Sequence, residues 1–210
     1  MTKKYNSVLI IGMGLIGSSI SRALVENHVA NSVYGLDTND KIIKKCHDLN
    51  LLVQGETNLK NFDLQFDLII ICTPLSAYKN IFSSLSDFIS QPTLITDVGS
   101  TKMSTISDFK NAVTNTNITF VPSHPIAGLE KSGPEYGFSK LFDNRYCILT
   151  PYEKNDAATS SITEMWKSIG MTVELMEADR HDRVLAMTSH IPQLIAFSVV
   201  GTATELESHM

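Results

Sequence analysis

Positions 12–17 read Gly-Met-Gly-Leu-Ile-Gly, a GxGxxG pattern whose glycines suit a bound dinucleotide. The pattern follows the apolar run Val8–Ile11, an expected strand, and opens Leu15–Glu26, an expected helix. In that setting the first glycine permits a tight turn, the second lets the backbone approach a pyrophosphate, and the third allows close helix–strand packing. Amides at the helix amino terminus then face the negative charge. The candidates for cofactor binding in this segment are Gly12, Met13, Gly14, Leu15, Ile16 and Gly17.

Asp37 lies 20 positions after Gly17, where the second expected strand, Val33–Leu36, ends. A carboxylate at that place accepts hydrogen bonds from ribose hydroxyls and repels a 2′-phosphate, which favours NAD over NADP. No arginine directly follows Asp37, although Lys41 is nearby. The alternative is a glycine-rich turn without a ligand, in which Asp37 caps the next helix. The strand–turn–helix context favours the dinucleotide.

Polar segments after later strands are candidates for the reacting end of the site. Thr73 and Pro74 follow the apolar run Leu68–Cys72 and can form a wall beside the cofactor. Ser100, a further candidate for contact with the cofactor, follows the fourth expected strand, and His124 follows the fifth. A histidine at this edge can accept the proton of a hydroxyl that loses hydride, and Ser100 can share the proton network. A backbone-bonded loop histidine and a helix-capping serine are the alternatives, and spacing does not decide between the two readings of His124.

A long helical pattern begins at Arg180 and carries further polar candidates. At about 3.6 residues per turn, His190 shares a face with Arg183, and Arg180 points in a broadly similar direction. We favour a solvated helix start for the two arginines, because most charged residues stay exposed. Ser189 and His190 stand just before Pro192, which we expect to kink the helix. This polar pair favours a substrate role over helix packing alone.

The candidates are carried by short apolar runs that alternate with longer amphipathic ones, which is typical of an α/β fold. Further helices are expected over 40–49, 77–89, 100–113 and 156–169, and further strands over 93–96, 118–121, 146–149 and 172–176. The alternation predicts a parallel sheet with helices on both faces. The stretch 122–142 lacks periodicity, and so long a loop is usually functional.

The pattern changes near residue 177, after which the sequence reads as one helix over 180–207. We therefore expect a dinucleotide-binding domain over 1–177 and the first helix of a second, helical unit over 178–210. This boundary depends on the change of pattern alone.

Composition and charge limit the classes of function. The 210 residues carry a net charge of −5, with a pI near 5.6, which gives no electrostatic footprint for nucleic acid. The three cysteines are widely spaced without a CxxC, so we expect reduced thiols in a cytoplasmic protein and no metal site. We expect no signal peptide, because glycines interrupt the first apolar run and no cleavage site follows. We also expect no membrane span, because no stretch approaches 18 or more apolar residues.

Together these segments resemble the prephenate dehydrogenase family, which includes the arogenate dehydrogenases of tyrosine biosynthesis. The resemblance covers nearly the whole chain, and HPIAG followed by EKSG is its most specific part. The matching segments are GMGLIGSS at 12–19, Asp37, CTP at 72–74, TDVGSTK at 96–102, HPIAGLEKSG at 124–133, LTP at 149–151, HD at 181–182 and SHIP at 189–192.

The resemblance implies a Rossmann-type domain, doubly wound around a mainly parallel sheet, followed by the start of an all-helical domain that forms a homodimer. It implies NAD-dependent oxidative decarboxylation of prephenate or arogenate. Hydride leaves the ring carbon that bears the hydroxyl, while His124 accepts the hydroxyl proton and Ser100 orients it. Formation of the aromatic ring makes the loss of carbon dioxide strongly favourable.

The resemblance also supplies candidates for substrate binding: His190 with Ser189 in the pocket, and Glu130 with Lys131 at its entrance. The sequence departs from the family at Gln193, where many members have a second histidine. Members usually continue for several more helices, one of which supplies an arginine for the substrate's side-chain carboxylate. We therefore expect these 210 residues to be a truncated enzyme.

Two alternatives remain at this point. One is a dehydrogenase of the β-hydroxyacid type. Enzymes of that type resemble each other in using a catalytic lysine on the long interdomain helix, and the absence of lysine from positions 180–210 disfavours this class. A nucleotide-binding regulatory module would bind the dinucleotide without turnover. The sequence does not choose between prephenate and arogenate, since both present the same ring to His124, and it does not show whether tyrosine inhibits.

Overall fold

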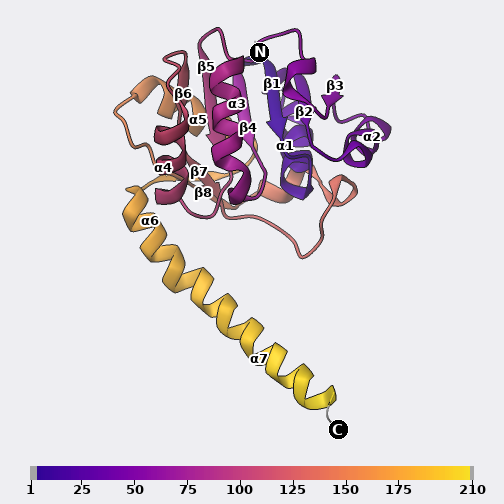
Figure 1. Ribbon diagram of the computed structural model, residues 1–210, viewed down its shortest axis with the longest axis vertical. Helices are drawn as coiled ribbons and strands as arrows, with labels where there is room; N and C mark the ends of the chain where they lie inside the picture. The colour runs from indigo at the N-terminus through magenta and orange to yellow at the C-terminus, as the bar shows by residue number, and fades with distance from the viewer. Residues whose placement is uncertain (1–3, 209–210) are drawn as a thin grey trace.

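The computed structural model describes residues 4–208, with side chains described to residue 204. Its body is a six-stranded parallel sheet in the order β3-β2-β1-β4-β5-β6 (Figure 1). The strands are β1 (Tyr5–Ile11), β2 (Ala30–Leu36), β3 (Gln54–Glu56), β4 (Leu68–Ile71), β5 (Thr93–Asp97) and β6 (Ile118–Phe120). The strand order reverses between β1 and β4, and such a switch point creates the crevice in which doubly wound folds bind dinucleotides.

Helices cover both faces of this sheet, as the alternation predicts. They are α1 (Leu15–Glu26), α2 (Asp40–Asp48), α3 (Tyr78–Phe88), α4 (Met103–Ala112) and α5 (Asp156–Ser168). Successive side chains of β1 and β4 enter opposite cores: Val8 and Ile70 pack with α1, α2 and α5, whereas Leu9 and Ile71 pack with α3 and α4. The continuous apolar runs therefore reflect strands that are buried on both faces.

A second, three-stranded sheet lies beside the first and corrects the expectation of one parallel sheet. It contains β7 (Ser123–Pro125), β8 (Tyr146–Leu149) and β9 (Thr172–Leu175), with β7 antiparallel to β8. An apolar run predicts a strand but not its neighbour, so β8 and β9 could not be assigned to a separate sheet. Because β7 reads Ser-His-Pro, without an apolar run, it was hidden in the stretch expected to be a loop.

Beyond β9 the chain forms one long helical run that leaves the body (Figure 1). It consists of α6 (Ala178–Leu185), a π-helical turn (Ala186–His190) and α7 (Ile191–Ser208). We expected a kink at Pro192, and the structure has the π-helical turn directly before it. Proline lacks the N–H that would continue the regular helical pattern, and the wider turn accommodates that loss.

The long helical run also corrects the expectation about membrane spans. Mean hydropathy reaches 1.5 within Ala178–Thr204, so this stretch could cross a membrane by length and composition alone. Core helices of soluble proteins pass the same test, which makes it weak evidence for a membrane. Large apolar side chains on α7 are exposed: Ile191, Leu194, Ile195, Phe197, Val199 and Val200.

Candidate active site and cofactor cleft

Three glycines shape the turn from β1 into α1, each for a different steric reason. Gly12 has a φ of +94°, and a Cβ there would lie 2.7 Å from the carbonyl oxygen of Cys72. A Cβ on Gly17 would collide with the carbonyl oxygen of Gly12, so only glycine lets the helix pack this closely. At Gly14 no described atom lies within 4 Å of the position a Cβ would take. The backbone at Gly14 is therefore open to a ligand.

The carboxylate of Asp37 is fixed at the end of β2 beside this turn. Its two oxygens accept hydrogen bonds from the backbone N–H groups of Met13 and Asn39, each at 2.9 Å. Asn39, not Asp37, caps α2, because its side chain accepts from the N–H of Lys41. The helix-capping alternative for Asp37 is therefore wrong.

A cleft of about 600 Å³ opens at the switch point between β1 and β4. Among the residues that line it are Gly12, Gly14, Asp37, Thr73 and Pro74. The hydroxyl of Thr73 is buried and has no hydrogen-bond partner within the described chain. An open backbone, a carboxylate and an unpaired hydroxyl around one cleft fit the pyrophosphate and ribose of a dinucleotide.

The other cofactor candidates do not line this cleft. Met13 is fully buried and contributes its backbone N–H to Asp37. Leu15 is buried, Ile16 packs on the same core, and Gly17 is enclosed by Gly12. These residues pack inside the turn and set its shape without lining the cleft.

His124 lies on β7, opposite Ile148 of β8, and is the first of three linked polar side chains. Its Nδ1 lies 2.9 Å from Nε2 of His181, which is fully buried. On the other side of the His181 ring, Nδ1 lies 2.8 Å from a carboxylate oxygen of Asp182. This set, called here the histidine chain (His124, His181 and Asp182), joins β7 to α6.

Asp182 also closes the amino terminus of α4. Its carboxylate oxygens accept the backbone N–H groups of Lys102 at 2.8 Å and Met103 at 2.9 Å. The capping alternative for Ser100 is therefore wrong, and α4 begins later than expected. Ser100 is exposed in the turn before α4, and within the described chain no hydrogen bond joins it to His124.

A fully buried ion pair lies behind the histidine chain. Nζ of Lys102 donates to a carboxylate oxygen of Asp97 at 2.6 Å and to the carbonyl oxygen of Ser123 at 2.7 Å. The other oxygen of Asp97 accepts the N–H of Ser123 at 3.0 Å. The pair thus holds both backbone groups of the residue that precedes His124.

This environment favours the neutral form of His124. Burial, which has the largest effect, the charge of Lys102 and the neighbouring His181 and His190 together lower its pKa to about 3, against the opposite effect of Asp182. The pKa of His181 is also lowered, first by burial. Burial acts to raise the pKa of Asp182, but hydrogen bonds from backbone amides and from His181 hold it below its usual value. The ring of His124 is therefore neutral at neutral pH, and its link through His181 to the carboxylate of Asp182 gives it a partner that can share an accepted proton.

The chain matches the family model described as prephenate dehydrogenase, nucleotide-binding domain, over residues 20–175. It is 34% identical over 204 residues to the cyclohexadienyl dehydrogenase of Zymomonas mobilis, covering 97% of this chain and 69% of that protein. The chain belongs to the prephenate dehydrogenase family. It is also 31% identical to the prephenate dehydrogenase of Bacillus subtilis, but spans only 54% of that protein.

Solved structures agree with this assignment. Prephenate dehydrogenase from Aquifex aeolicus in complex with hydroxyphenyl propionate and NAD+ superposes with a TM-score of 0.87 at 34% identity, covering 94% of this chain and 68% of that one. A 3-hydroxyisobutyrate dehydrogenase from Mycobacterium tuberculosis has a TM-score of 0.68 at 11% identity, which shows a shared fold alone. The Rossmann-type, mainly parallel architecture is thereby confirmed.

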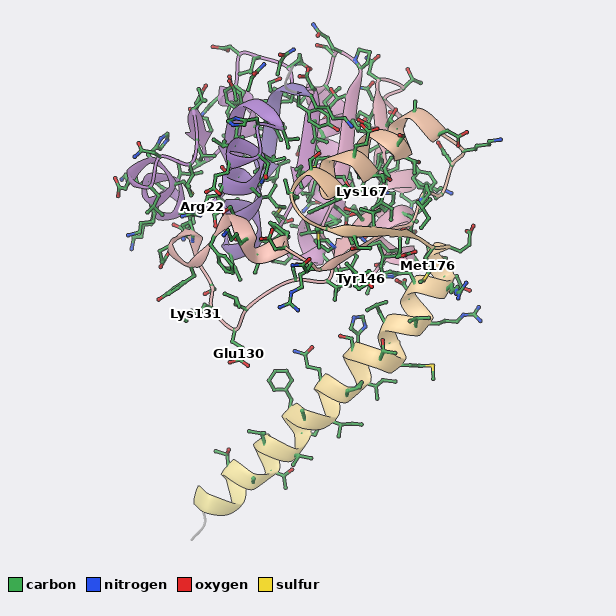
Figure 2. All side chains as sticks on the ribbon, turned by 180° about the vertical axis from the view of Figure 1, so that it is seen from behind. Arg22, Glu130, Lys131, Tyr146, Lys167 and Met176 are labelled. Atoms are coloured by element: carbon green, nitrogen blue, oxygen red, sulfur yellow. The ribbon has the colours of Figure 1, made fainter. Side chains whose placement is uncertain are left out.

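The remaining site candidates of this prephenate dehydrogenase family member lie at different distances from His124. His190, at the end of the π-helical turn, is close enough to influence the pKa of His124. Ser189 is exposed. Glu130 and Lys131 are exposed on the loop after β7, and Figure 2 shows Glu130 at the outer tip of that loop, pointing away from the sheet. The structure does not bring these last three against His124.

Sequence reasoning assigned no role to four residues of this site. They are Asp97, Lys102, His181 and Asp182, all of which lie in segments that match the family. One signal was available: Asp97 ends an otherwise uncharged, largely buried strand, and a charge in such a place requires a partner. The partner itself, five residues later, could not be read from spacing.

Proposed function

We propose that this chain catalyses the NAD-dependent oxidative decarboxylation of prephenate or arogenate in tyrosine biosynthesis. The observation that carries the proposal is a neutral histidine, His124, held by a carboxylate-linked partner at the carboxyl edge of a dinucleotide-binding sheet. The membership in the family and the NAD+ complex of the A. aeolicus relative support it. NAD, when bound, supplies the acceptor for hydride.

The residues that would hold NAD are those around the cleft. Amides at the start of α1 would face the pyrophosphate, with Gly14 allowing close approach. Asp37 would accept from the ribose hydroxyls, and the buried hydroxyl of Thr73, which has no partner within the described chain, could bond to the cofactor. Pro74 forms part of the wall.

His124 would take the proton of the substrate hydroxyl as hydride leaves the same ring carbon. Its Nδ1 is occupied by His181, so Nε2 is the nitrogen that receives the proton. The carbonyl formed in this way can accept the electron pair released when the bond to the ring carboxylate breaks. Carbon dioxide then leaves, the ring becomes aromatic, and the phenolate oxygen takes up one proton.

The division of the chain and its assembly form part of the same proposal. Residues 1–177 would form the NAD-binding domain, and 178–210 would begin a helical unit. The exposed apolar side chains of α7, among them Leu194 and Phe197 at 66% and 68% exposure, favour a homodimer formed through that unit. Sedimentation at rising concentration tests this. A stable monomer, or a chain that partitions into lipid vesicles, would contradict it.

The proposal is tested by His124→Asn, which keeps a polar side chain but removes the base. A positioned base contributes about 10²–10⁴ to a rate, so kcat for NADH formation should fall by that factor. Affinity for NAD, measured by calorimetry, should stay nearly unchanged because His124 does not line the cleft. Prephenate and arogenate are assayed side by side. A loss of less than about threefold would remove His124 from this role. NAD binding without turnover of either substrate, in a protein that also carries the further helices of the family, would favour a regulatory module.

A further inference from the structure

We propose that His181 and Asp182 are positioning residues that fix the tautomer of His124 and conduct its proton between the substrate and solvent. The inference deepens the proposed function, on which its catalytic part rests. The histidine chain joins residues 57 positions apart in the sequence through hydrogen bonds of 2.9 Å and 2.8 Å. No role for either residue follows from the cofactor cleft, which neither of them lines.

The tautomers follow from which atoms can donate. An ionised carboxylate only accepts, so Nδ1 of His181 must carry the proton that bonds to Asp182. Neutral His181 then has a lone pair on Nε2, and Nδ1 of His124 must donate to it. The remaining nitrogen of His124, Nε2, is left as a lone pair. Without His181, the neutral ring of His124 could carry its proton on either nitrogen. The tautomer with the proton on Nε2 could not accept the substrate's proton at that atom.

Burial differs along the histidine chain, and this difference gives proton transfer a direction. The side chain of His181 is fully buried, whereas that of Asp182 is 25% exposed. Lys102, which directly precedes α4, and His190 of the π-helical turn both disfavour a positive charge on His124. A positive charge is therefore not retained on His124: as Nε2 accepts a proton, the proton on Nδ1 leaves, and the exposed carboxylate is its route to solvent.

The proton transfers balance in both directions. When Nε2 of His124 takes the hydroxyl proton, its Nδ1 proton passes to Nε2 of His181, and the Nδ1 proton of His181 passes to Asp182 and on to water. After decarboxylation, Nε2 of His124 gives its proton to the phenolate oxygen. The same bonds then carry one proton back from water, which restores both original tautomers.

The tautomer can be measured without turnover. In protein labelled with 15N-histidine, long-range 1H–15N correlations at pH 7 distinguish Nδ1–H from Nε2–H rings, and His124→Asn and His181→Gln spectra assign the two signals. We expect Nδ1–H for both residues. An Nε2–H tautomer for His124 would overturn the inference whether or not the chain is active, so this result is separate from the fate of the proposed function.

Matched substitutions of His181 separate the two parts of the role. The amide oxygen of His181→Gln can still accept from Nδ1 of His124 but cannot pass a proton on, whereas His181→Leu does neither. We expect kcat to fall about tenfold in the first and about a hundredfold in the second, with KM and NAD affinity nearly unchanged. If the Leu variant does not fold, the Gln variant and the unmodified protein still decide. Equal kcat in the Gln variant and the unmodified protein would overturn the conduction of protons.

Discussion

The cofactor cleft and the histidine chain are built by opposite means. The cleft is formed by backbone and by the absence of side chains, since Gly12 and Gly17 permit approaches that any Cβ would prevent. The region behind His124 is formed by charged side chains that meet from distant segments, with Lys102 and Asp97 fully buried. The cleft therefore depends on the shape of the backbone, whereas the region behind His124 depends on each buried charge having an opposite charge beside it. Their variants should fail in correspondingly different ways.

The buried ion pair should give the largest effect on stability. Lys102→Met leaves the carboxylate of Asp97 buried without its cation, and breaking such a pair costs about 3–5 kcal/mol. Urea unfolding measures the loss. Adding Asp97→Asn to the same chain removes the uncompensated charge and should restore part of the stability. If Lys102→Met alone is as stable as the unmodified protein, the ion pair is not essential to the stability of this region.

Two alanine substitutions sharpen the contrast within the cleft. Gly17→Ala forces a methyl group against the carbonyl of Gly12, and overpacking of this kind costs about 1–3 kcal/mol. Gly14→Ala meets no described atom within 4 Å, so stability should hold while the methyl group obstructs the cofactor. Unfolding and NAD titration are measured on both. Equal losses of stability in the two variants would contradict the steric argument.

Asp37 should control the choice of cofactor. Asp37→Ser removes a charged acceptor worth about 1.5–3 kcal/mol per hydrogen bond, so NAD should bind about tenfold or more weakly, and discrimination against NADP should relax. Calorimetry with both nucleotides checks this. The assignment is wrong if the unmodified protein binds NADP more tightly than NAD.

A further prediction concerns the pH dependence of stability. The pKa of His124 is lowered to about 3 and that of His181 is also lowered, so in acid the unfolded chain takes up protons that the folded chain does not. Stability should fall as the pH drops below about 6.5, by at most about 1.4 kcal/mol per pH unit for each ring. Thermal unfolding between pH 7.5 and 5 measures the slope. His124→Asn should flatten it, and an unchanged slope would contradict the shift.

The same pKa changes an expectation about catalysis. A histidine base of ordinary pKa would give a rate that rises with pH near neutrality. Because burial, with the nearby Lys102, His181 and His190, lowers the pKa of His124 to about 3, the ring stays neutral at lower pH, and that rise should not appear near pH 6.5. A clear histidine-like inflection in kcat/KM would instead point to another group.

Local patterns predicted the fold well where the signal is local. The bounds of α1 agree with the expected helix, because its apolar periodicity and the glycines before it are contiguous. Strand pairing is not contiguous, which is why the separate sheet of β7, β8 and β9 was missed. β3 was missed because Gln54–Glu56 is a short edge strand without an apolar run.

The site shows the same limit. Glycine spacing and Asp37 predicted a cleft that the structure contains, because these features lie within one strand–helix–strand unit. The carboxylate that caps α4 belongs to Asp182, 80 residues away from Lys102 in the sequence. No local pattern could have identified Asp182 as the cap in place of Ser100. The sequence assigned no role to His181, and only tertiary packing against β7 buries it.

The double attachment of Asp182 has a mechanical consequence. This carboxylate fastens the near end of the long helical run to α4, while α7 extends away from the body (Figure 1). At about 1.5 Å per residue, Ala178–Ser208 measures on the order of 45 Å, so the run is a lever whose fulcrum lies one residue from His181. A tilt of about 5° at that fulcrum displaces the far end by roughly 4 Å over this length. A force that a partner applies to the far end of α7 would therefore be transmitted, amplified by the length of the run, to His181, whose ring contacts His124.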